Sequence, residues 1–177
     1  MLGCGHKKPC RFLQMPQSPP ESSLVWTTLD VNPNTNPDVL FDLDTIEHGN
    51  PLPFVNDYFD EIHAYEVMEH YGRQGDYRGF FTGMAELWRI LKPNGYLFGT
   101  SPGMRSVWAW GDPGHTRAIS AEMFSYLTLE MYRNPGDNAA SDYSRLVNPC
   151  WWDLGYDQDL DDHIHFTLRK LSPVQVQ

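Results

Sequence analysis

The chain has 177 residues, of which 41% are hydrophobic and 14% aromatic, so it carries enough apolar material for one packed core and no room for a second full domain. Its formal net charge of −10 disfavours nucleic acid as a partner, because a grip on phosphate backbones depends on clustered Lys and Arg. The sequence contains no apolar run of the roughly 18 residues that a membrane span needs and no signal-peptide core, so we expect a cytoplasmic protein without a membrane anchor.

The first segments along the chain are short. Residues 1–5 fit the end of a strand that runs into a glycine turn, and residues 6–23 contain four prolines, which argue against a long helix. Residues 24–31 are rich in β-branched and aromatic side chains and stop at Asn32-Pro33, so they predict a strand followed by a turn. We predict further strands over residues 39–43 and 59–65, with an extended loop at 51–56 between them.

The clearest helix spans residues 76–91, where apolar side chains recur every three or four positions. The sequence Lys-Pro-Asn-Gly at 92–95 ends this helix and leads into a strand at 96–100. We expect a loop over 101–120, a short helix over 121–129, and one or two closing strands near 151–152 and 163–171. Strands that alternate with helical segments predict an α/β fold with a mainly parallel sheet.

Gly3, Gly5 and Asp30 form the first group of residues with a chemical role. Glycines let the backbone approach a nucleotide-like cofactor, and a carboxylate after the second strand accepts hydrogen bonds from ribose hydroxyls. Asp30 lies 25 residues after Gly5, close to the spacing of about 20 in such folds. Taken singly, the glycines also fit an ordinary turn and Asp30 a cap at a strand end. Lys7 and Lys8 stand where a dinucleotide fingerprint has its third glycine, which disfavours a nicotinamide cofactor.

Four stretches read in order extend this pattern: LGCG, TTLDVNPNTNPDVLFDLD, PLPFVNDYFDEIHAYEVMEH and ELWRILKPNGYLFGTSP. Together they resemble the class I S-adenosylmethionine-dependent methyltransferases, over about residues 1–102. The resemblance implies a Rossmann-like three-layer α/β sandwich, mainly parallel with an antiparallel closing strand. It also implies one domain over 1–177, with a cofactor-binding core at 1–102 and a substrate-side loop and closing strands at 103–177.

The resemblance also assigns cofactor contacts in three groups. The glycine loop would face the methionine and ribose part, the acid after the second strand the ribose, and the acid after the third strand the adenine. The residues that match these positions are Gly3, Cys4 and Gly5, then Asp30 with Val31, then Asp42 with Leu43, and finally Ala64, Tyr65 and Glu66 near the transferable methyl group. Asp42 and Asp44 also fit solvated turn acids, and Asp42 is favoured over Asp44 for the adenine.

Three side chains are candidates for accepting a proton from the methyl acceptor, namely Glu66, His70 and His115. Glu69-His70 also fits the simple stabilisation of a helix start by an acidic residue. The loop that carries Trp110, His115 and Arg117 follows the fifth strand, where substrate enters such folds, so these three residues are candidates for the acceptor side. The same loop also fits a lid folded by its own tryptophans.

No metal site is predicted. The three cysteines lack a C-x-x-C pair, and the alternating His163 and His165 fit a surface pair on an edge strand. The resulting function is methyl transfer from S-adenosylmethionine to a small-molecule or saccharide-like acceptor, by a monomer or homodimer. A cofactor-binding module without catalysis, acting as a sensor or assembly component, is the alternative.

Overall fold

The computed structural model describes residues 1–6, 11–133, 140–160 and 162–172. Its strands are β1 (Leu29–Asp30), β2 (Val39–Leu40), β3 (Phe59–Tyr65), β4 (Leu91–Pro102), β5 (Trp152–Leu160) and β6 (His163–Lys170). Its α-helices are α1 (Tyr77–Ile90), α2 (Trp108–Gly111), α3 (Ala121–Ser125) and α4 (Ser144–Val147). Short 3₁₀ helices are η1 (Glu21–Ser23), η2 (Pro33–Thr35), η3 (Leu43–His48), η4 (Met68–His70) and η5 (Glu130–Tyr132).

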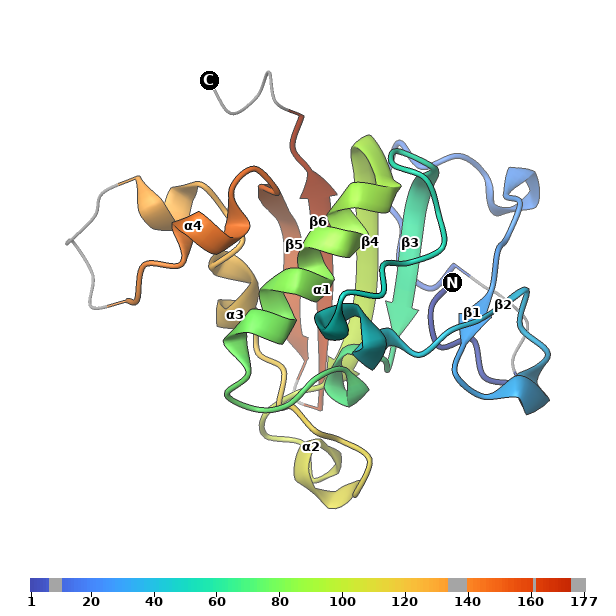
Figure 1. Ribbon diagram of the computed structural model, residues 1–177, viewed down its shortest axis with the longest axis horizontal. Helices are drawn as coiled ribbons and strands as arrows, with labels where there is room; N and C mark the ends of the chain where they lie inside the picture. Colours follow the sequence, from blue (N-terminus) through green and yellow to red (C-terminus); the bar gives the residue numbers. More distant parts are fainter. Residues whose placement is uncertain (7–10, 134–139, 161, 173–177) are drawn as a thin grey trace.

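Leu2 joins the strands into one sheet. β1 pairs in parallel with β2, and β3, β4, β6 and β5 lie side by side in that order (Figure 1). Leu2 makes parallel bridges to Leu29 on one side and to Ala64 on the other, so it stands in the place of a central strand. β3 and β4 are parallel, whereas β6 runs antiparallel to both β4 and β5. The predicted α/β Rossmann-like sheet with an antiparallel closing strand is confirmed.

One face of the sheet packs against α1, which crosses it diagonally (Figure 1). The predicted helix at 76–91 is present as α1, and the Asp76 side chain caps its first turn by accepting a hydrogen bond from the Gly79 amide over 3.0 Å. The apolar stripe of α1 and the inward residues of β3, β4 and β6 form the core. Gly99 leaves the space that the Phe166 ring fills, because a Cβ there would lie 2.0 Å from that ring.

The opposite face is covered by residues 11–28, which are mainly irregular in structure. Arg11 forms a 2.9 Å ion pair with Glu61, and the Trp26 ring packs on His63, which itself stacks on Phe98. Burial lowers the pKa of His63. The third layer of the sandwich is thus built from polar and aromatic contacts of an extended segment rather than from a long helix.

Several boundaries differ from those predicted. The strand expected over 24–31 is reduced to β1, because the neighbouring segment offers pairing only between Met1 and Cys4, and Val25 is 97% exposed. The strand expected over 39–43 ends at Leu40, since η3 begins at Leu43 with Asp42 as its cap. The loop expected over 101–120 contains α2, and the helix expected over 121–129 ends at Ser125. Within the described residues, no helix has the length and apolar character to cross a membrane.

Candidate cofactor-binding site

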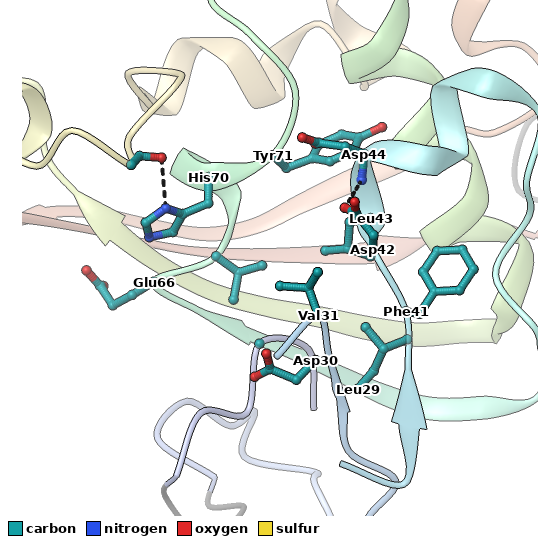
Figure 2. Close-up of a pocket in the computed structure, with 13 residues that line it drawn as sticks. Leu29, Asp30, Val31, Phe41, Asp42, Leu43, Asp44, Glu66, His70 and Tyr71 are labelled. Carbon is teal, nitrogen blue, oxygen red and sulfur yellow. Dashed lines mark hydrogen bonds between the residues drawn. The ribbon is translucent and has the colours of Figure 1, made fainter. Parts of the chain in front are cut away.

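A pocket of about 400 Å³ opens where β1, β2 and β3 end. In an open parallel α/β sheet, this carboxyl edge is where ligands bind. Figure 2 shows the lining side chains gathered around the pocket from these strands, from η4 and from the loop after α2. The lining residues are Gly3, Leu29, Asp30, Val31, Phe41, Asp42, Leu43, Asp44, Glu66, Val67, His70, Tyr71 and Gly114.

Asp30 fixes the turn after the first strand. Its Oδ2 accepts a hydrogen bond from the Gly5 amide over 2.8 Å, and its Oδ1 accepts one from the Asn32 amide over 2.8 Å. The Cys4 thiol lies 3.7 Å from the same Oδ2 and is buried. Since a carboxylate can accept about four hydrogen bonds, Asp30 retains acceptor capacity while it holds both loops. Gly5 and Asp30, predicted to converge, therefore lie in direct contact.

Gly3 brings the backbone to the pocket wall. Its φ of 55° lies in the left-handed region, and a Cβ at this position would stand 2.6 Å from Cγ2 of Val67. Gly5 has nearly the same φ, 54°, but a Cβ there would meet no atom within 4 Å. The first glycine thus serves close packing and the second serves only the turn.

Asp42 and Asp44 both line the pocket and both are exposed. The Asp42 Oδ1 accepts a hydrogen bond from the Asp44 amide over 3.0 Å, which caps η3. The Asp44 Oδ1 accepts one from the Gly72 amide over 2.9 Å and so joins η3 to the segment after η4. The assignment of Asp42 to the adenine remains a prediction.

Glu66 leaves β3 with a φ of 55°, a strained value for a residue other than glycine. Its Oε1 accepts a hydrogen bond from the Thr100 hydroxyl over 2.7 Å, and its Oε2 lies 3.7 Å from Nε2 of His163. These contacts turn the carboxylate toward the pocket mouth, on the side where Figure 2 places His70. His163 is thus part of the surroundings of the pocket, which its sequence position gave no reason to expect.

His70 and His115 meet at the edge of the pocket. Their ring centroids are 4.7 Å apart, with the planes at 77°. The preceding residue, Glu69, has 2% of its surface exposed, and neither of its carboxylate oxygens has a hydrogen-bond partner within the described part of the chain. Burial raises the pKa of this carboxyl group. A buried acid without a partner is energetically costly, so its retention here needs a reason.

Other predicted residues lie away from the pocket. Ala64 is fully buried within the sheet, and the Tyr65 hydroxyl faces the opposite side, where it accepts hydrogen bonds from the Phe12 and Leu13 amides. Trp110 is 67% exposed on α2. Arg117 is buried beneath its loop, where its guanidinium donates to the carbonyls of residues 73 and 76, so it serves the structure of the loop.

The pocket also contains residues that the sequence did not single out. Val67, Tyr71 and Gly114 line it although no role was assigned to them from the sequence. Tyr71 is buried and donates a hydrogen bond to the Gly79 carbonyl over 2.9 Å, so it ties the pocket wall to α1. The sequence could have indicated these three residues only through their positions next to the predicted residues Glu66, His70 and His115.

No protein-family model matches the chain, and no curated protein does. Solved structures do. A methyltransferase dependent on S-adenosylmethionine from Archaeoglobus fulgidus superposes with a TM-score of 0.56 at 14% identity, over 96% of this chain and 84% of the other. The protein PH0226 from Pyrococcus horikoshii OT3 superposes with a TM-score of 0.55 at 9% identity, over 96% of this chain and 79% of the other. The N-methyltransferase NodS from Bradyrhizobium japonicum WM9, crystallised with S-adenosyl-l-homocysteine, gives 0.48 at 16% identity, over 82% and 66%. The two superpositions with TM-scores above 0.5 show that the chain has the Rossmann-like fold found in the Archaeoglobus fulgidus methyltransferase.

Proposed function

We propose that this chain binds S-adenosylmethionine in the pocket at the ends of β1 to β3 and transfers its methyl group to a small-molecule or saccharide-like acceptor. The single observation that supports this best is the contact between Asp30 and the Gly5 amide, which joins the acid that we assign to the ribose to the glycine turn. The pocket volume of about 400 Å³ falls within the range of about 300–1,000 Å³ for small-molecule sites.

The residues present fit this cofactor. Gly3 keeps the wall free of a side chain, since a Cβ there would enter the space of Val67. Asp30 accepts hydrogen bonds from two amides and from the Cys4 thiol, so it retains about one of its roughly four acceptor positions for a ribose hydroxyl. Leu29, Val31, Phe41 and Leu43 supply apolar lining that suits an adenine ring.

The bound cofactor would supply an electrophilic methyl group. The contribution of the chain is to align the acceptor with that group and to exclude water, because an in-line displacement depends mainly on position. Glu66 and His70 line the pocket, and His115 touches His70, so these three residues are the candidates for accepting a proton from the acceptor. The rings of His70 and His115 each direct Nδ1 at a carbonyl oxygen, so Nδ1 carries the proton and Nε2 keeps its lone pair. A neutral imidazole of this form can accept a proton from the methyl acceptor.

The first test asks whether Asp30 contacts the ribose of the cofactor. We expect Asp30→Ala to weaken binding of S-adenosylhomocysteine by about 1.5–3 kcal/mol, roughly 10- to 150-fold, the range for a hydrogen bond to a charged group. Isothermal titration calorimetry with the 2′-deoxy analogue of S-adenosylhomocysteine distinguishes a direct contact between Asp30 and the ribose from an indirect effect of the substitution on the glycine loop. If Asp30 holds the ribose, the wild type distinguishes the analogue from the parent compound and the variant does not.

Two outcomes would contradict the proposal. Equal affinity of the folded Asp30→Ala protein for S-adenosylhomocysteine would remove the ribose assignment. Tight cofactor binding without turnover over a broad panel of acceptors would instead support the alternative function, a cofactor-binding module without catalysis.

A further inference from the structure

We propose that Glu69, His70 and His115 bind a divalent transition-metal cation, such as Zn²⁺, beside the pocket. One ligand atom from each of these residues lies within 4.8 Å of the ligand atoms of the other two. Metal–nitrogen and metal–oxygen bonds of about 2.0–2.2 Å place neighbouring ligands about 3–4 Å apart, so these ligand atoms would need to approach one another by no more than about 1–2 Å to bind one cation. The sequence alone predicted no metal here.

Glu69 is the observation that points to a cation. Its side chain is buried, and neither carboxylate oxygen has a partner at full hydrogen-bond geometry within the described residues; the Ser101 hydroxyl, which also has no such partner, is its polar neighbour. Buried charges in proteins are paired or coordinate metals, because desolvation without compensation costs several kcal/mol. His70 and His115 are the metal-ligating side chains next to Glu69.

Both imidazoles are held in the form that binds metals. His70 Nδ1 lies 3.0 Å from the Gly114 carbonyl oxygen, and His115 Nδ1 lies 2.8 Å from the Trp108 carbonyl oxygen (Figure 2 draws the first). A carbonyl only accepts, so each Nδ1 must carry a proton and donate it. Nε2 then keeps its lone pair, which is the usual arrangement of a ligating histidine. The Asp112 carboxylate, 3.8 Å from Nε2 of His115, is the other acidic neighbour of that ring.

The cluster is preorganised by its backbone. The Glu69 carbonyl accepts hydrogen bonds from the Thr116 amide over 2.9 Å and from the Arg117 amide over 3.1 Å, and the Gln74 amide donates to the Thr116 carbonyl over 2.9 Å. These three bonds fasten the loop that carries His115 to η4, which carries the other two ligands. The two segments that carry the ligands are therefore joined before a cation binds.

Two imidazoles and one carboxylate form a ligand set typical of catalytic zinc and related transition metals. Three protein ligands leave at least one position of the cation open. His70 and Gly114 line the pocket, so this open position lies on its border. If the proposed methyl transfer holds, an oxygen or nitrogen of the acceptor would occupy this position. The two imidazoles would then be ligands, and Glu66 would be the candidate left to accept the proton. The cation site itself does not depend on that function.

The experiment uses full-length, tag-free protein stripped with a chelator and titrated with ZnCl₂ by calorimetry. We expect one Zn²⁺ per chain in the wild type and an affinity loss of roughly 100-fold or more in Glu69→Gln and in His115→Ala, since even partners outside the ligand set change affinity by about 10- to 100-fold. His48→Ala is the matched control, because the His48 side chain is 74% exposed and lies outside the cluster. The visible spectrum of Co²⁺-loaded protein should show histidine coordination that both variants lose.

Absence of saturable binding in the wild type, or equal affinity in the folded variants, would overturn the site. The two variants probe different segments, η4 and the loop, so a folding defect in one leaves the other informative. Titration of the same proteins with S-adenosylhomocysteine keeps the two proposals apart. Zn²⁺ binding without cofactor binding removes the methyltransferase function alone, and the reverse result removes the metal site alone.

Discussion

Asp30 and Glu69 are both buried acids beside one pocket, but the chain treats them in opposite ways. Asp30 follows β1, and both of its oxygens accept backbone amides at 2.8 Å. Glu69 lies in η4 with 2% of its surface exposed and no hydrogen-bond partner among the described residues. The Asp30 carboxylate has partners within the chain and stabilises its loop. A buried carboxylate without such partners, as at Glu69, raises the free energy of the folded state until a ligand such as a cation binds it. The first stabilises a turn and the second marks a site.

The largest change in the free energy of unfolding should come from replacing Asp30 by its amide, asparagine. We expect Asp30→Asn to lower the free energy of unfolding by about 3 kcal/mol, because one charged acceptor is lost and an NH₂ group faces an amide donor. Urea denaturation followed by circular dichroism measures this change. A loss below about 1 kcal/mol would mean that the Asp30 contacts do not hold the glycine turn.

The two glycines of that turn provide an intermediate test with a built-in control. Gly3→Ala should cost about 2–3 kcal/mol, since it combines a left-handed φ with a Cβ 2.6 Å from Val67. Gly5→Ala should cost only about 1 kcal/mol, because it has the same φ but no atom within 4 Å of the added Cβ. Equal losses in thermal and urea unfolding would show that backbone conformation alone sets the requirement.

The smallest loss is expected at Glu69. In chelator-treated protein, Glu69→Gln should lower the free energy of unfolding by no more than about 1 kcal/mol, since the amide loses no hydrogen bond of full geometry and no longer carries the buried charge. Excess Zn²⁺ should then raise the melting temperature of the wild type and leave that of the variant unchanged. A loss of several kcal/mol in the metal-free variant would show that a partner within the chain already satisfies this acid.

The sequence predicted the parts of the fold that depend on local pattern. The helix α1 follows from the spacing of its apolar side chains, and the strand at Phe59–Tyr65 was predicted from its mixture of apolar and polar positions. It failed where a neighbour decides the outcome: the residues before Leu29 have strand-type composition but little to pair with. Tyr65 was placed near the cofactor, yet its hydroxyl faces residues 12 and 13, because side chains alternate between the two faces of a strand.

The residues of the site also fall into those that the sequence indicated and those that only the tertiary structure brought together. Gly3, Gly5 and Asp30 could be selected from the sequence, because glycines and a carboxylate at strand ends fit a nucleotide-like cofactor and the resemblance to class I methyltransferases assigns them a role. The cluster of Glu69 and His70 with His115 could not, because 45 positions separate the two histidines and tertiary hydrogen bonds, among them those of Thr116 and Arg117 to the Glu69 carbonyl, bring their segments together. Residue types and periodicity therefore determined the sheet, the long helix and the glycine turn. Tertiary structure decided which acid is satisfied and which is left without a partner, because hydrogen-bond partners depend on distances that no local pattern contains.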